Sequence, residues 1–232
     1  MGVYVGDKRY APYIGDKRRR VMGGIAREPR LPDEYQEVKY IKNVDATIGL
    51  GTGFKFNFQD YEFECTFSKD SVPTDNEQGV FGTNFGNNQQ FKFRFDVRTG
   101  RMVMCFSNKE NIVISTFNTD KHTIHYVGGA SSQELYYDGS LLRSYTYTDL
   151  PTTTTNSLGL YRNGSAGATF KDGLIYHVFL KRISTNSILL DYIPCKRKAD
   201  SYPGFYDLAT DSFMTITDAD LHWVCGPNFI GG

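Results

Sequence analysis

The stretch Tyr61-Glu-Phe-Glu-Cys-Thr-Phe67 decides the fold, because apolar and polar side chains alternate along its whole length. The same alternation runs through Phe91-Lys-Phe-Arg-Phe-Asp-Val97. Successive side chains of a β-strand point to opposite faces, so a period of two is typical of a sheet with one buried face. Both stretches are therefore predicted to be strands, with Phe63, Phe93 and Phe95 buried between two sheets.

Turn residues separate further strands on either side of these two. Thr99-Gly100 is predicted to close a hairpin, and Asp138-Gly139 supplies the positive φ angles of a type I′ turn. The stretch Leu174-Ile-Tyr-His-Val-Phe-Leu180 is apolar on both faces, so we expect a strand covered on each side, with Tyr176 in the core. No segment of helical period exceeds two turns, and many short strands at regular spacing are typical of an all-β sandwich.

The composition allows a single β-domain with a leader of different character. The chain has 232 residues, and its 17 Phe and 16 Tyr favour pleated, half-buried surfaces. Its net charge is zero, but residues 1–30 hold eight Lys/Arg against three Asp/Glu, a net of +5. A basic leader suggests a partner of its own, and a simply solvated leader remains the alternative.

The leader contains an internal repeat. Tyr4-Val-Gly-Asp-Lys-Arg9 recurs as Tyr13-Ile-Gly-Asp-Lys-Arg18, each copy an aromatic residue, a β-branched residue, a Gly-Asp turn and two cations. Two such strand–turn units cannot bury much alone, so we expect them to dock on a partner or on neighbouring copies. The predicted interface residues are Tyr4, Val5, Tyr13, Ile14, Arg18, Arg19 and Arg20. Tyrosines beside an arginine triplet would also suit nucleic acid, but the Gly-Asp turns favour a protein partner.

Two further strings carry a resemblance to a known family. Near the C-terminus, Asp191-Tyr-Ile-Pro-Cys-Lys-Arg-Lys-Ala-Asp200 is followed by Gly204-Phe-Tyr-Asp-Leu208, and far upstream stands Leu31-Pro-Asp-Glu-Tyr-Gln-Glu-Val-Lys-Tyr-Ile41. In the same order, they resemble the closing and opening strings of laminin-G-like, concanavalin A-like domains in structural proteins of phages and gut bacteria. Asp33-Glu34 departs from the small residue and Gly that this family usually has there. The resemblance spans roughly residues 31 to 227.

The resemblance implies both a fold and a setting. We expect residues 31–232 to form a concanavalin A-like antiparallel β-sandwich (jelly roll), and residues 1–30 an extended docking segment with a linker. The implied protein is a non-enzymatic phage virion component, on a head or tail appendage, whose lectin-like domain adheres to host-surface glycans. A purely structural or decorating virion protein without sugar binding is one alternative, and a bacterial surface glycan-binding module is another. We expect the leader to contact other virion proteins, with a homo-oligomer such as a trimer also open.

Residues suited to catalysis or metal binding do not form a recognisable set. Glu62 and Glu64 have the i, i+2 spacing of a sandwich glycosidase, but Thr66 follows in place of a third acid, so we predict a solvated face and no catalytic residue. His122 and His125 should point to opposite faces of a strand and therefore cannot share a metal. His177 and His222 are interpreted as structural histidines.

No cofactor is predicted. Calcium stays open because some laminin-G relatives bind it, yet no twelve-residue calcium loop occurs. Turn formation explains the four candidate ligands, Asp207, Asp211, Asp218 and Asp220.

The predicted ligand site rests on two loops rich in amide side chains. Sugars are held by amide and cationic hydrogen-bond donors beside an aromatic ring, and these loops supply all three types. Asn and Gly also dominate turns for backbone reasons, which is the alternative explanation. The candidate residues are Asn84, Asn87, Asn88, Tyr161, Arg162 and Asn163.

The sequence also suggests where the protein is made. It shows no apolar run of membrane-helix length and no secretory signal, so we expect synthesis in a host cytoplasm, no membrane partner and final residence in the virion. Thiols stay reduced in a cytosol, and no Cys-x-x-Cys occurs. All four cysteines are therefore predicted to be free, with Cys65 buried and a Cys195–Cys225 bridge as the first exception to consider.

Overall fold

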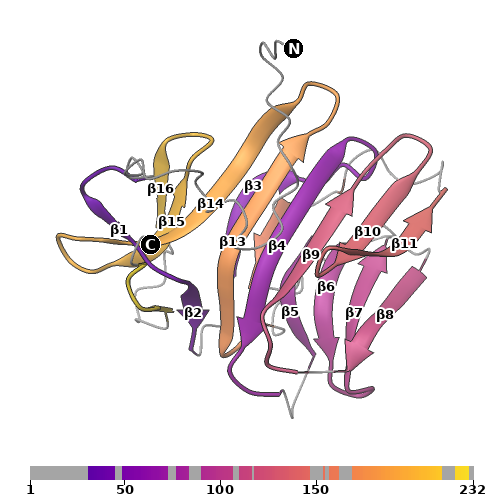
Figure 1. Ribbon diagram of the computed structural model, residues 1–232, viewed down its shortest axis with the longest axis horizontal. Helices are drawn as coiled ribbons and strands as arrows, with labels where there is room; N and C mark the ends of the chain where they lie inside the picture. The colour runs from indigo at the N-terminus through magenta and orange to yellow at the C-terminus, as the bar shows by residue number, and fades with distance from the viewer. Residues whose placement is uncertain are drawn as a thin grey trace, which may run out of the picture.

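The computed structural model describes residues 31–44, 49–72, 77–83, 90–106, 110–116, 118–146, 154, 157–161, 169–215 and 223–229. These residues form strands β1 to β17 in two sheets, all paired antiparallel, and contain no helix (Figure 1). The described segments accordingly contain no helix long and apolar enough to cross a membrane. The all-β sandwich predicted from the alternating patterns is confirmed, and its strands are antiparallel, as the resemblance implied.

The large sheet has eleven strands, eight of them side by side in one path. In order these are β11 (Ser140–Tyr145), β10 (Gln133–Tyr137), β9 (His122–Val127), β4 (Tyr61–Lys69), β13 (Gly173–Arg182), β14 (Ser187–Arg197), β15 (Pro203–Asp207) and β16 (Ser212–Thr215). Off this path, β1 (Tyr35–Glu37) pairs with β14, and β2 (Ile41–Asn43) pairs with both β13 and β17 (Trp223–Cys225).

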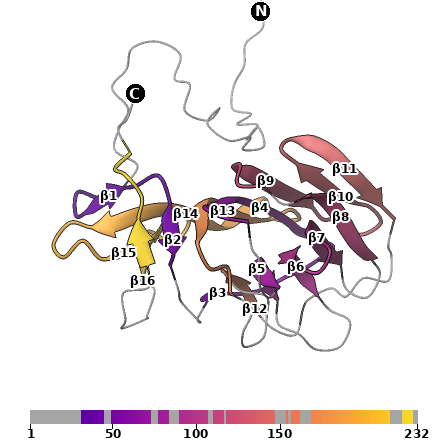
Figure 2. The same ribbon diagram turned by 90° about the horizontal axis from the view of Figure 1, so that it is seen from below.

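The small sheet has six strands and packs beneath part of the large one (Figure 2). Its order is β3 (Leu50–Lys55), β12 (Ser157–Leu160), β5 (Gln78–Thr83), β6 (Phe91–Asp96), β7 (Arg101–Phe106) and β8 (Glu110–Thr116). Strands β1, β15 and β16 extend beyond the small sheet in both views (Figures 1 and 2). The large sheet therefore has one end that the small sheet does not cover.

Aromatic rings fill the space between the sheets. Phe63 of β4 lies 4.7 Å from Phe81 of β5 between ring centroids, and Phe67 lies 5.0 Å from Phe93. Phe56 stacks on Phe91 at 3.6 Å. Aromatic pairs in such contacts add to the stabilisation that comes from burying their area. The predicted core positions Phe63, Phe93 and Phe95 are buried, as expected.

The predicted hairpins form with the expected turn chemistry. Asp138 and Gly139 have φ angles of 50° and 79°, so the turn between β10 and β11 has the two positive φ angles of type I′. Gly100, with φ of 65°, turns β6 into β7.

The four cysteines are all free thiols, and Cys65 is buried in the core. Burial raises the pKa of Cys195 to about 12, and the neighbouring Cys225 adds to that direction. These findings agree with the predicted reduced state, and Cys195 and Cys225 do not form a disulfide.

Candidate functional site

The residues first predicted to hold a saccharide are mostly outside the described part of the chain. This applies to Asn84, Asn87, Asn88, Arg162 and Asn163. The predicted anchor residues Tyr4, Val5, Tyr13, Ile14, Arg18, Arg19 and Arg20 are also outside it. Tyr161 is described, and its side chain is completely buried, so the prediction that it contacts a ligand is wrong.

The burial of Tyr161 follows from its backbone. Leu158 and Leu160 of β12 face the core, and strict alternation would turn Tyr161 to the outside. Its φ angle of 56° breaks the strand there, and the ring packs 4.6 Å from Trp223 instead. The phenol donates a hydrogen bond to the carbonyl oxygen of Ile41, so its polar end is satisfied inside the core.

The outer face of the large sheet carries a row of polar side chains along β4. On β4, Glu62, Glu64, Thr66 and Ser68 alternate with the core residues. The prediction of a solvated face is wrong for Glu64, which is 2% exposed. Its Oε1 lies 3.7 Å from Nδ1 of His177, whose Nε2 lies 2.7 Å from Oδ1 of Asp191.

His177 is a structural histidine, as predicted, held between two carboxylates. Burial alone would lower the pKa of His177, but the hydrogen bond to Asp191 and the nearby carboxylate of Glu64 outweigh that effect and raise it. Glycoside hydrolysis needs two carboxyl groups open to one substrate. Glu64 is closed off by its surroundings, so this acidic group is suited to holding strands β4, β13 and β14 together.

His122 and His125 do point to opposite faces of β9, as predicted. On the outer face, His125 Nε2 lies 3.2 Å from Oε1 of Glu62, and its ring stacks on Tyr136. Lys181 contacts the other oxygen of Glu62 at 3.4 Å. The hydrogen bond to His125, opposed by burial and helped by Lys181, holds the pKa of Glu62 below its usual value.

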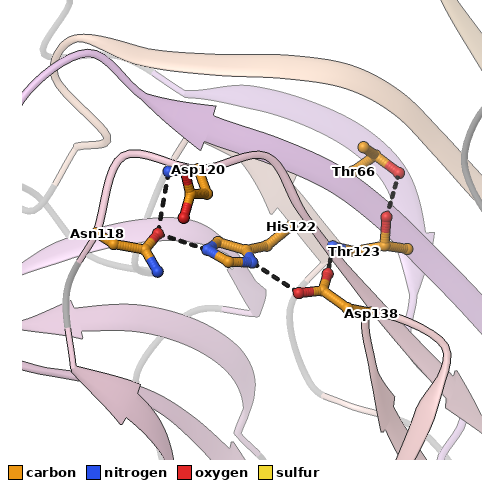
Figure 3. A network of polar contacts seen from close by, with 6 residues as sticks. All are labelled: Thr66, Asn118, Asp120, His122, Thr123 and Asp138. Atoms are coloured by element: carbon orange, nitrogen blue, oxygen red, sulfur yellow. Dashed lines mark hydrogen bonds and ion pairs between the residues drawn. The ribbon is translucent and has the colours of Figure 1, made fainter.

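His122 lies at the end of the sandwich in a network of polar contacts (Figure 3). Its Nδ1 lies 2.8 Å from Oδ2 of Asp138, and its Nε2 lies 2.6 Å from Oδ1 of Asn118. The amide of Thr123 donates to the other carboxylate oxygen of Asp138 at 2.8 Å. The network joins the turn before β9 to the turn between β10 and β11.

Tyr176 is not in the core, contrary to the sequence prediction. The register between β13 and β4 shifts between Ile175 and His177, so Tyr176 occupies a β-bulge. Ile175 and Val178 face the core, while Tyr176 turns outward, half-buried, and its hydroxyl lies 2.9 Å from Oγ of Ser68. One extra residue in the strand therefore places this ring on the outer face.

Several partly exposed polar side chains surround that ring. Tyr40 packs edge-on against Tyr176 at 5.5 Å, and the ammonium of Lys121 lies 5.4 Å from its ring centroid. Lys42 binds Asp70 at 2.6 Å and Asp172 at 3.3 Å. We call these residues the Tyr176 cluster: Tyr40, Lys42, Ser68, Asp70, Lys121, Asp172 and Tyr176.

The charges of the Tyr176 cluster are closely coupled. The hydrogen bond to Asp70, and then the one to Asp172, raises the pKa of Lys42. Burial raises the pKa of Tyr176, with Tyr40 and the Asp70 carboxylate acting in the same direction and the bond to Ser68 opposing them. The side chains of Asp70 and Asp172 are 51% and 31% exposed, so oxygen atoms of both remain open to solvent.

The arrangement combines two aromatic rings, two cations, two carboxylates and hydroxyl groups where strands of the large sheet begin or end. Its members lie in or directly beside β2, β4, β9 and β13, and no local motif joins them in the sequence. The only sequence signal for this cluster was the presence of polar residues at the ends of the predicted strands. The bulge that turns Tyr176 outward could not be predicted, because the stretch around it is apolar on both faces and shows no break in its pattern.

Metal ligands do not gather in the described residues, where no group of three or more His, Cys, Asp or Glu side chains is placed to hold an ion. Asp207 instead accepts hydrogen bonds from the amides of Asp191 and Ala209, and Asp211 accepts one from Tyr206. These two aspartates act in turns, as predicted. Asp218 and Asp220 lie outside the described residues, as does His222.

Comparison with known proteins finds likeness in structure alone. No protein-family model matches the chain, and no curated protein matches it in sequence.

Among solved structures, a Trypanosoma rangeli sialidase in complex with 2,3-difluorosialic acid matches with a TM-score of 0.42 at 11% identity. The match covers 62% of this chain and 30% of the sialidase. Galectin LEC-6 of Caenorhabditis elegans matches with a TM-score of 0.39 at 9% identity, over 62% of this chain and 96% of the galectin.

The CBM40 of the Ruminococcus gnavus IT-sialidase matches with a TM-score of 0.38 at 13% identity. That match covers 60% of this chain and 90% of the CBM40. At these identities and scores, the likeness assigns neither a family nor an activity to this chain.

Proposed function

We propose that the protein is a non-enzymatic phage virion protein, carried on a head or tail appendage, whose sandwich binds a host-surface glycan through the Tyr176 cluster. The Tyr176 cluster itself is the observation that supports this proposal. A half-buried tyrosine offers an apolar face with a polar rim, and charged groups beside it form stronger hydrogen bonds than neutral ones do. A sugar needs both, because its ring has an apolar face and its edges carry hydroxyl groups.

The geometry of the Tyr176 cluster suits such a ligand. Asp70 and Asp172 are held by Lys42 and still expose carboxylate surface that can accept hydrogen bonds from hydroxyl groups. Lys121 is exposed above the Tyr176 ring and can donate to them. The burial of Glu64 supports a binding role over a hydrolytic one, since it removes one of the two acids that the sequence pairs on β4.

A glycan array with the full-length protein tests the proposal directly. Tyr176→Ala should reduce the signal of the bound glycans by about tenfold or more, as expected for the loss of an aromatic anchor. Asp70→Asn should weaken binding while leaving the ring in place.

Tyr202→Ala is the matched control, because Tyr202 is also half-buried and has the guanidinium of Arg197 5.6 Å from its ring centroid. Its array signal should equal that of the unmodified protein. An array without bound glycans, or equal losses in the Tyr176 and Tyr202 variants, would contradict the proposed site and favour a purely structural virion protein.

The virion setting is supported by the basic, repeated leader together with the resemblance of the sandwich strings. Leader contacts with other virion proteins, and self-association as a trimer, belong to the same proposal. A mass-spectrometric inventory of purified phage particles tests it, and we expect peptides of this chain at a fixed ratio to the head or tail proteins. Their absence from particles would favour the bacterial surface module.

A further inference from the structure

The two cations of the Tyr176 cluster differ in what they bind. Lys42 contacts both carboxylates of the cluster, Asp70 at 2.6 Å and Asp172 at 3.3 Å. The ammonium of Lys121 contacts no carboxylate among the described residues and lies over the ring of Tyr176 instead, 5.4 Å from its centroid. The side chain is exposed, and such a contact between a cation and a ring is weak at the surface. Lys121 is therefore the cation of this cluster that is open to a ligand.

Strand pairing fixes where Lys121 stands. Phe67 of β4 pairs with His122 of β9 in an antiparallel register. The next position in that register sets Ser68 opposite Lys121. The Oγ atom of Ser68 lies 2.9 Å from the hydroxyl oxygen of Tyr176, so this ring reaches from β13 over to β4. The backbone of two paired strands thus keeps the ammonium and the ring together.

The negative groups of the Tyr176 cluster lie apart from this ammonium. Asp70 directly follows β4 and Asp172 directly precedes β13, and no ion pair joins either of these described residues to Lys121. The cluster therefore presents a positive group over the ring and partly exposed carboxylate oxygens beside it. A ligand that fits both parts carries an acidic group and, at some distance from it, hydroxyl groups that can donate hydrogen bonds.

We infer that the glycan bound by the Tyr176 cluster is an acidic one whose carboxylate, sulfate or phosphate group pairs with Lys121, an inference that rests on the proposed function of the cluster. This pairing draws the ammonium away from the ring and uncovers the aromatic face for the sugar. The hydroxyl groups of the same sugar then donate to Asp70 and Asp172. A neutral glycan also has to displace Lys121 from the ring but offers no charge in return, so it binds more weakly.

Matched glycans that differ only in one acidic group test the inference. The full-length protein is titrated with the carboxylated, sulfated, phosphorylated and neutral forms of one saccharide, and isothermal titration calorimetry gives the dissociation constants. We expect at least one acidic form to bind more tightly than the neutral form, and the arms show which acidic group it is. Added salt should weaken the binding of that form and leave the binding of the neutral form unchanged, because salt screens exposed charges.

Lys121→Gln separates the effect of the charge from that of the ring. Binding of the acidic glycan should weaken by about two- to fivefold, which is the range of an exposed ion pair. Binding of the neutral glycan should stay the same or strengthen by up to about fivefold, because the ammonium no longer competes for the ring.

Lys198→Gln is the matched control. Lys198 is also exposed, forms no ion pair with the other described residues and lies in the turn between β14 and β15. Both substitutions remove one positive charge from the protein, so they change its overall charge equally. The Lys198 variant should bind the acidic and the neutral glycan as the unmodified protein does.

The outcomes separate this inference from the proposed function. If acidic and neutral glycans bind equally well and both depend on Tyr176, the proposed function stands and the acidic specificity is overturned. Equal losses of acidic binding in the Lys121 and Lys198 variants overturn it as well, because the overall charge would then be the cause. A protein that binds neither kind of glycan contradicts the proposed function, and the inference fails with it.

Discussion

Phe93 illustrates what alternation assigns to a single residue. Its ring is fully buried on β6, 5.0 Å from Phe67 of the opposite sheet and 5.8 Å from Phe81 beside it. Phe93→Ala should lower the free energy of unfolding by about 3 to 5 kcal/mol, through lost burial and the cavity left behind. Urea denaturation measures the loss, and Leu141→Ala, at a residue 55% exposed, is the control that should change little. A loss below about 1 kcal/mol for Phe93→Ala would contradict its burial.

His177 gives a stability contribution with a defined pH dependence. Its pKa in the folded protein is raised by Asp191 and Glu64, so the contribution is complete below the pKa of an unfolded histidine and is lost as pH rises through the folded value. His177→Gln should cost about 3 to 5 kcal/mol at acidic pH, because it leaves buried carboxylates without their cation. The difference between the two proteins, measured by urea denaturation, should shrink as pH rises. A difference that grows with pH would show that His177 is neutral in the folded state.

Sequence patterns placed residues wrongly for two reasons. Alternation assigns a side chain to a face only while the strand stays regular, and it says nothing about what covers that face. A bulge turned Tyr176 outward, and a positive φ angle turned Tyr161 inward. Glu64 does lie on the outer face, but His177 and Asp191 close around it there. These contacts come from strands far apart in the chain, so no local spacing records them.

Turns were better predicted than sites, because their signals are local. Asp138-Gly139 and Gly100 adopt positive φ angles, as their types suggest. The order of strands in the sheets was not predictable in the same way, because β4 pairs with β13 from more than 100 positions later. The pairing depends on how two apolar faces fit together, which the pattern of one strand does not contain.

Two glycines separate the effect of backbone conformation from that of packing. A Cβ added at Gly100 or at Gly51 would meet nothing within 4 Å, but only Gly100 has a positive φ angle, of 65°. Gly100→Ala should therefore destabilise the protein by about 1 to 2 kcal/mol, the cost of a left-handed conformation for a residue with a Cβ. Gly51→Ala should be neutral or stabilising by less than about 1 kcal/mol, because it restricts the unfolded chain. If both substitutions lowered the free energy of unfolding equally, the positive φ angle at Gly100 would not be the cause of its loss.

The whole molecule should resist thiol reagents until it unfolds. Burial raises the pKa of all four cysteines, so few thiolates are present at neutral pH. Thiol titration in denaturant without reductant should find four free groups, whereas the folded protein should react slowly, beginning with the half-buried Cys225. Fewer than four groups after denaturation would indicate a disulfide and an oxidising compartment.

The leader gives the last prediction, which concerns the division of the chain at residue 30. Leu31 is buried against Ile193, Cys195 and Tyr206 on the large sheet, so this residue already packs as part of the sandwich. Deleting residues 1–24 should leave these contacts intact and give a folded domain with an unchanged melting temperature.

The same deletion removes both copies of the Tyr-x-Gly-Asp-Lys-Arg repeat and six of the eight leader cations. Apolar side chains and open strand edges of such a repeat are satisfied by pairing with a partner sheet. The truncated protein should therefore be excluded from phage particles when it is produced during infection, as measured by its amount in purified virions. A variant that keeps the tyrosines, β-branched residues and Gly-Asp turns of the repeat and replaces Arg18, Arg19 and Arg20 by Ser distinguishes strand pairing from charge. Strand pairing predicts that this variant is still incorporated. Incorporation of the truncated protein at the level of the full chain would show that the sandwich itself makes the virion contact.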